Sequence, residues 1–128
     1  MKTYEIYFED GASPEPHEIQ TALFLKKHGK DIKFLAPQNR DHIKTPDIAM
    51  DGLKWEIKAP ISNGSRVVEH ALRSATRQSP NVIIDLRRGK MPDTRALRQI
   101  SHEAKKRKTT LRKLLIITKA QNIVDLSD

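Results

Sequence analysis

The chain has 128 residues, which fits one compact domain with a workable hydrophobic core. It contains no cysteine, which excludes a disulfide framework, a zinc site with thiolate ligands and a cysteine nucleophile. The net charge of +8 favours an anionic partner, namely a nucleic acid, an anionic membrane or an acidic protein. The sequence has no apolar run as long as a membrane span and no signal-peptide pattern at its N-terminus. If the protein is exported, its export signal is expected on a larger parent chain or elsewhere.

The first third of the chain predicts two strands on either side of a helix. Alternating apolar and polar residues over 2–8 are typical of a strand. A helix is expected from a cap at or near Ser13 to about His28, with Leu23 in its apolar stripe. Residues 31–35 predict a second strand.

The last half of the chain predicts helices that alternate with apolar strands. Helices are expected over about 66–78 and 92–106, and buried-type strands over 81–86 and 114–118. A short edge strand follows at 123–126. With the hairpin described next, the order is β-α-β-β-β-α-β-α-β-β. This order predicts a single-domain α/β (α+β) fold with a mixed central sheet flanked by helices.

Residues 44–60 carry the strongest local signal. The dipeptide Asp51–Gly52 lies between two alternating segments, which is typical of a hairpin with a two-residue turn. That register puts Leu53 and Trp55 on the same face as other apolar residues. We therefore predict that this face packs against the core.

The opposite face of the hairpin carries three charged residues suited to catalysis. The register sets Asp47 directly opposite Glu56, with Lys58 on the same face. Directly opposed like charges are destabilising, so two carboxylates here suggest a shared ligand such as Mg²⁺ or Mn²⁺. The lysine could stabilise negative charge on a phosphate. The alternative is an exposed face on which Lys54 forms an ordinary ion pair.

The segments Pro46–Asp47 and Glu56–Lys58 resemble the PD-(D/E)XK nuclease motif. The resemblance implies a restriction-endonuclease-like core over about residues 15–86. It also implies that the two acids bind Mg²⁺, Mn²⁺ or Zn²⁺ and that the lysine assists catalysis. That family often adds an acidic residue on an upstream helix, and Glu18 matches that position.

A wider resemblance covers nearly the whole chain. The segments Trp55–Pro60, Asn81–Arg87 and Leu114–Thr118 are similar to C-terminal toxin domains of contact-dependent growth inhibition (CdiA) proteins of the tRNase type. This implies one toxin domain over 1–128, with a tRNA substrate and a cognate immunity protein, expected to be acidic. It also implies delivery as the C-terminal part of a secreted or cell-surface effector that acts in the bacterial cytoplasm. Some interbacterial tRNases work without metal, so the resemblance leaves metal dependence open.

The predicted helix after the hairpin has a basic face. Four of its residues are spaced four, three and four apart, so they share one side of the helix. We expect this stripe to border the active site and to follow a phosphate backbone, with Gln78 contributing. His70, the histidine of this stripe, could be a general acid or base, a phosphate ligand or a surface residue. The stripe consists of Arg66, His70, Arg73 and Arg77.

The C-terminal region, about 92–126, is strongly basic. Between Arg87 and Lys113 there are eleven lysines and arginines and two acidic residues. Cations at the end of a helix favour its dipole, which is a structural reason for part of this cluster. We also predict that the cluster docks a folded RNA. The expected contacts are Arg87, Lys105, Lys106 and Lys108.

Four candidate functions remain, and we rank them in order of preference. The first is a metal-dependent tRNase toxin. The second is a metal-independent RNase that uses His70, Lys58 and Arg73. The third is a PD-(D/E)XK DNase, and the fourth is a nucleic-acid-binding module without activity.

Overall fold

A computed structural model describes residues 2–38 and 45–127. Its helices and strands follow one another in the predicted order. The first strand is shorter than predicted, because pairing with its neighbour covers only three residues. The elements are β1 (Ile6–Phe8), α1 (Pro16–Lys27), β2 (Ile32–Phe34), β3 (Ile48–Met50), β4 (Leu53–Lys58), α2 (Val67–Gln78), β5 (Asn81–Asp85), α3 (Asp93–Lys105), β6 (Lys113–Ile117) and β7 (Ile123–Asp125).

The strands form one mixed sheet in which the spatial order equals the chain order, β1 to β7. Three neighbouring pairs are parallel, namely β1–β2, β4–β5 and β5–β6, and each is connected by one of the three helices. This is the expected connection, because parallel neighbours need a crossover long enough to return the chain to the same end of the sheet. The remaining pairs are antiparallel. The predicted mixed sheet flanked by helices is confirmed.

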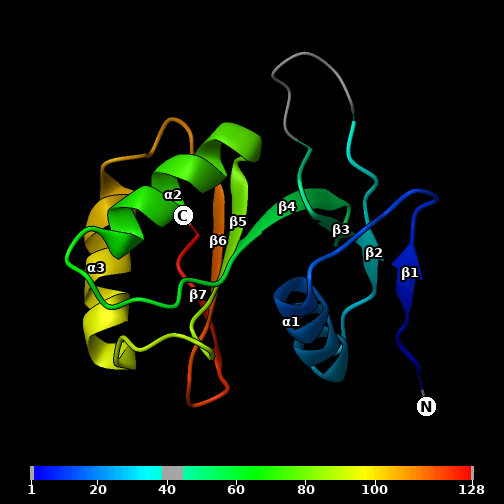
Figure 1. Cartoon of the computed structure of the whole chain (residues 1–128), viewed down its shortest axis with the longest axis horizontal. Coiled ribbons are helices and arrows are strands. Elements are labelled where there is room, and N and C mark those ends of the chain that lie inside the picture. The colour runs from blue at the N-terminus through cyan, green and yellow to red at the C-terminus, as the bar shows by residue number, and fades with distance from the viewer. Residues whose placement is uncertain (1, 39–44, 128) are drawn as a thin grey trace.

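Helix α1 lies beside the β1–β4 half of the sheet, and α2 and α3 lie beside the β5–β7 half (Figure 1). The α1 side of the core contains Leu25, Trp55 and Ile83. The other side contains Leu72 from α2 and Ile100 from α3 together with Val82, Ile84 and Leu114. Neighbouring residues of β5 thus enter different cores, as alternation along a strand requires. Every residue of β5 is buried, which confirms the prediction of a strand covered on both faces.

Two apolar residues predicted to be buried are on the surface. Leu53 is 36% exposed and directly follows the hairpin turn. Leu23 is 40% exposed, since α1 buries Thr21, Ala22, Phe24 and Leu25 instead. The buried stripe of α1 is therefore turned relative to the predicted one, and it includes a polar residue.

That polar residue belongs to a link between α1 and β5. The Thr21 hydroxyl donates a hydrogen bond of 2.6 Å to Oδ2 of Asp85, a buried carboxylate. Arg87 donates to the same oxygen at 2.8 Å and to the backbone carbonyl of Gln20 at 3.0 Å. The Arg87 guanidinium also lies 4.6 Å from the ring centroid of Phe24. This link holds the first half of α1 against the C-terminal end of β5.

Within the described part of the chain, none of the helices combines the length and the apolar character that crossing a membrane would require.

Candidate functional site: a buried carboxylate cluster

The hairpin has the predicted turn and register. Asp51 and Gly52 have φ values of 54° and 76°, the left-handed conformation that a tight two-residue hairpin turn needs. Ile48 pairs with Trp55, and Trp55 is buried as predicted. The Trp55 indole N–H donates to the backbone carbonyl of Met50 at 2.9 Å, which satisfies its polar atom inside the core.

Asp47 lies at the end of this hairpin, one residue before β3, and its side chain is held by the opposite strand. Its backbone N–H donates to the carbonyl of Trp55 at 2.9 Å. Its Oδ2 accepts a hydrogen bond of 2.8 Å from the backbone N–H of Ile57. The carboxylate is therefore fixed beside Glu56, the residue between these two partners. The predicted pairing of Asp47 with Glu56 is replaced by this side-chain link, which still brings the two acids together.

Glu56 is more deeply buried than the hairpin pattern predicts. The residue is 3% exposed, although it alternates with Trp55 and Ile57, whose side chains enter the α1 core. Burial, followed by the charge and hydrogen bonding of Asp47, raises the pKa of Glu56 to about 8. Lys58 opposes this rise, with its Nζ 3.4 Å from Glu56 Oε2. The other oxygen, Oε1, is buried and has no hydrogen-bond partner among the described residues.

Glu18 reaches the same cluster from the first turn of α1. Its Oε1 accepts a hydrogen bond of 3.2 Å from the backbone N–H of Glu15, which forms a capping box at the start of the helix. Burial, followed by the charge of Asp47, raises the pKa of Glu18 to about 7. Asp47 is thus a common neighbour of both glutamates. Glu18 and Asp47 also line a cavity of about 180 Å³, which gives the cluster access to solvent.

The carboxylates of this cluster are candidate ligands for a divalent cation, although the three ligand atoms that lie within 4.8 Å of one another belong to Glu15, His17 and Glu18. Carboxylate oxygens are the preferred ligands of Mg²⁺ and Mn²⁺, and Glu18, Asp47 and Glu56 supply them from three separate segments. A buried oxygen without a partner carries a desolvation cost, and a cation at Glu56 Oε1 would relieve it. Burial is the main cause of the raised pKa values of Glu18 and Glu56, and the charge of Asp47 adds to it.

The metal-free protein should lose stability as the pH rises through neutrality. Glu18 and Glu56 keep protons in the folded state up to about pH 7 and 8, whereas the usual value for glutamate is 4.5. The folded state therefore binds more protons than the unfolded state, so the free energy of unfolding falls from about pH 4.5 to about pH 8. Thermal melts in chelator across this window measure the effect. The Glu56→Gln variant should show a shallower decline, and an equal decline in both proteins would contradict the assignment.

His17, in the first turn of α1, is a neighbour of this cluster that was not among the site residues predicted from the sequence. Its Nδ1 lies 3.4 Å from Glu15 Oε2 and its Nε2 lies 4.0 Å from Glu18 Oε2. Burial and the charge of Arg88 lower the pKa of His17, although the charges of Glu15, Asp47 and Asp85 oppose this. Glu15, His17 and Glu18 each offer one ligand atom within 4.8 Å of the others. His17 precedes Glu18 in the chain, but only folding brings Arg88 beside it.

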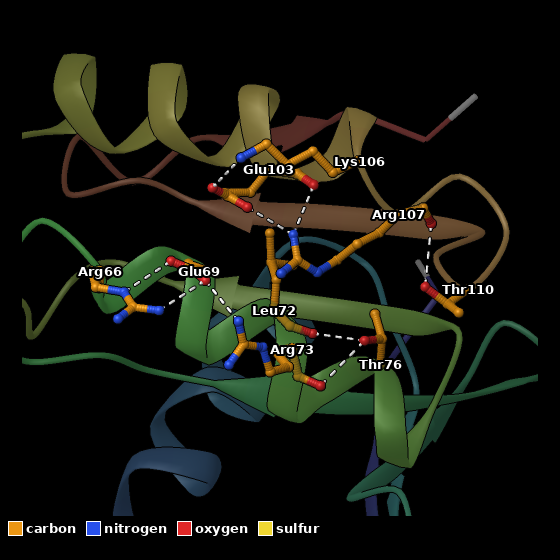
Figure 2. A network of polar contacts seen from close by, with 9 residues as sticks. All are labelled: Arg66, Glu69, Leu72, Arg73, Thr76, Glu103, Lys106, Arg107 and Thr110. Atoms are coloured by element: carbon orange, nitrogen blue, oxygen red, sulfur yellow. Dashed lines mark hydrogen bonds and ion pairs between the residues drawn. The ribbon is translucent and has the colours of Figure 1, made fainter.

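The basic stripe of α2 lies on an exposed face of the helix, as predicted. Figure 2 shows that Glu69 lies between two of its members, Arg66 and Arg73, and the shortest contacts are 3.2 Å and 2.7 Å. His70 and Arg77 are also exposed, whereas Gln78 is partly buried at the helix end. None of these residues has a contact with Glu18, Asp47 or Glu56 among the interactions of the described residues. Their predicted role beside the active site stays a prediction.

The C-terminal basic residues divide into two groups. Lys106 forms an ion pair with Glu103 at 3.3 Å, and Arg107 binds the same glutamate (Figure 2). Lys105 and Lys108 instead line a cavity of about 260 Å³ beside the start of β6, at the opposite end of the parallel strands from Lys58. Arg87 is engaged in the link to α1, so its main contacts are internal.

The chain resembles known proteins in sequence and in fold. The family model described as the contact-dependent growth inhibition CdiA C-terminal domain matches residues 44–123, which is more than half of the chain. Among solved structures, the chain is similar to a CdiA-CT/CdiI toxin and immunity complex from Burkholderia pseudomallei, with a TM-score of 0.70 and 18% identity. The similarity covers 97% of this chain and 99% of that one. No curated protein matches the sequence. At this identity, the structural similarity supports the fold alone.

Proposed function

Because this chain belongs to the family of contact-dependent growth inhibition CdiA C-terminal domains, we propose that it is a metal-dependent nuclease toxin of the PD-(D/E)XK type. The toxin domain assignment follows from the family and from the fold. The nuclease activity is our proposal, and the substrate we favour is structured RNA, in particular tRNA, over DNA.

The observation that carries the proposal is the environment of Glu56. A buried glutamate with an unpartnered oxygen, beside Asp47 and 3.4 Å from Lys58, is costly to fold. A purely structural role does not require this acid, because an apolar residue at position 56 would pack in the core without this penalty. A site that binds a cation gives the buried carboxylate a purpose.

The chain's own groups have distinct roles in this proposal. Glu18, Asp47 and Glu56 would hold the cation, and Asp47 is kept in place by the backbone N–H of Ile57. When bound, a divalent cation supplies charge stabilisation to a phosphate and lowers the pKa of water. The Lys58 ammonium, 26% exposed at the end of β4, would stabilise the negative charge that develops on the phosphate oxygens.

The proposed substrate and partner follow from charge. The exposed arginines of α2 and the pair Lys105 and Lys108 can contact phosphates outside the active site. The similar structure from Burkholderia pseudomallei is a toxin and immunity complex, and we propose that this chain also has a cognate immunity protein. With a net charge of +8 on the toxin, that protein is expected to be acidic. Delivery from a cell-surface effector and action in the bacterial cytoplasm are part of the same proposal.

Cleavage assays with and without chelator test the proposed function. Purified protein should cut unfractionated tRNA when Mg²⁺ or Mn²⁺ is present, and EDTA should abolish the cut until metal is restored. Plasmid DNA in a parallel reaction separates an RNase from a DNase. Full activity in EDTA, together with loss of activity in His70→Ala, would instead support the metal-independent RNase. Absence of cleavage of either polymer under all metal conditions would contradict a nuclease.

A further inference from the structure

A cavity of about 240 Å³ lies at the C-terminal ends of β4 and β5, next to the carboxylate cluster. Ala59, one of its lining residues, directly follows Lys58, and His17 directly precedes Glu18. His17 lines the cavity and its Nε2 lies 4.0 Å from Glu18 Oε2, so this histidine connects the cavity with the cluster. The C-terminal ends of parallel strands are a common place for ligands to bind. The cavity is lined by His17, Gln20, Ala59, Asp85, Arg87 and Arg88.

The two arginines of this cavity are adjacent in sequence but differ in their contacts. Arg87 is bound to Asp85 through its Nε at 3.0 Å and an Nη at 2.8 Å, so these two charges neutralise each other. Arg88 is exposed and uses its Nε to donate to the carbonyl of Ala59 at 2.7 Å. Neither terminal nitrogen of Arg88 has a hydrogen bond among the interactions of the described residues. The cavity therefore presents one uncompensated guanidinium group, suited to an anion with several acceptor oxygens.

The loop that carries Arg88 is tightly held against the end of β4. Lys90 donates its backbone N–H to the carbonyl of Ile61 at 2.8 Å, and Gly89 donates to the carbonyl of Leu86 at 3.1 Å. A Cβ atom at Gly89 would lie 2.6 Å from the carbonyl oxygen of Pro60, so only glycine allows this approach. Arg88 is thus placed at a set position relative to Lys58, as a preorganised binding group requires.

We propose that Arg88 binds a backbone phosphate of the polynucleotide next to the phosphate that is cleaved. This inference rests on the proposed nuclease function and adds a substrate-binding residue to it. A single-stranded or folded polynucleotide presents a phosphate at every nucleotide, so a neighbouring phosphate accompanies each scissile one. The Asp85 carboxylate does not repel the phosphate at Arg88, because Arg87 and Thr21 already bind both oxygens of that carboxylate. Arg88 would position the strand and take no part in bond breaking.

Salt-dependent binding tests this role without relying on turnover. The measurement uses the Glu56→Gln protein, labelled unfractionated tRNA and a labelled DNA duplex, over a range of salt concentrations. Adding Arg88→Ala should weaken binding by about tenfold, the loss expected for one charge-assisted hydrogen bond. It should also reduce the slope of log K against log salt by about one. Arg88→Lys should keep most of the slope. Lys26→Ala, which removes an exposed cation from the other end of α1, should change neither quantity.

Each alternative result has a separate meaning. Unchanged affinity and slope in Arg88→Ala, with normal binding by the parent, would overturn the phosphate role and leave the nuclease proposal intact. Equal losses in Arg88→Ala and Arg88→Lys, with lowered melting temperatures, would overturn it in favour of a structural role for the bond to Ala59. A parent protein that binds neither polymer would overturn both proposals.

Discussion

Replacement of Glu56 by glutamine is expected to abolish cleavage while the protein stays folded and becomes no less stable. The change keeps the shape of the side chain but removes the charge that a cation would need. Groups that merely orient metal ligands contribute about 10–100-fold to affinity or activity, so loss of a direct ligand should cost at least about 100-fold. The folded state should tolerate the change because the pKa of Glu56, raised to about 8 by burial and by Asp47, already favours the uncharged form at neutral pH.

Two measurements separate this result from simple unfolding. The thermal midpoint of Glu56→Gln should equal or exceed that of the unmodified protein in chelator, and Mn²⁺ should raise it less. Glu5→Gln, which removes an exposed carboxylate near the N-terminus, serves as the matched control and should retain full activity. Full cleavage by Glu56→Gln would show that the carboxylate cluster is not the catalytic metal site, whatever the substrate.

Local sequence patterns predicted the fold because its elements depend on short-range preferences. The Asp51–Gly52 turn sets the hairpin register, and alternation along the strands then determines which residues lie on the same face of the hairpin as Trp55. The apolar strand that includes Val82 is buried on both sides, as its composition indicates. These features follow from turn geometry and from the period of two residues along a strand. Asp47 and Glu56 could be identified for the same reason.

Burial in three dimensions was less predictable. The periodicity does not show that Glu56 becomes 3% exposed, because that depends on what covers the second face of the hairpin. It also does not show that Leu53 is exposed at the hairpin end. The meeting of His17 with Arg88 depends on α1 docking against β5, which joins residues far apart in the sequence. Such contacts have no short-range signal, so the cavity between the two residues could not be predicted.

The adjacent arginines illustrate this limit. Both belong to a basic segment, and the sequence suggested a substrate contact for Arg87. In the fold, Arg87 binds Asp85, whereas Arg88 is exposed. Because Asp85 is 4% exposed, its carboxylate requires the partner that Arg87 provides. Burial opposes its ionisation, but hydrogen bonds from Arg87 and Thr21 outweigh that effect and hold the pKa of Asp85 below its usual value.

Arg87→Ala should therefore destabilise the protein far more than Arg88→Ala. Loss of the guanidinium leaves the Asp85 carboxylate buried with Thr21 as its remaining side-chain donor, which should cost about 3 kcal/mol of unfolding free energy. Arg88→Ala removes one hydrogen bond to Ala59 from an exposed residue and should cost about 1 kcal/mol or less. Urea denaturation at neutral pH measures both values. In the Arg87→Ala background, Asp85→Asn should recover part of the loss, because it removes the unpaired charge. Equal destabilisation by the two alanine variants would contradict this division of roles, since it would mean that Arg87 is no more important to the fold than its neighbour.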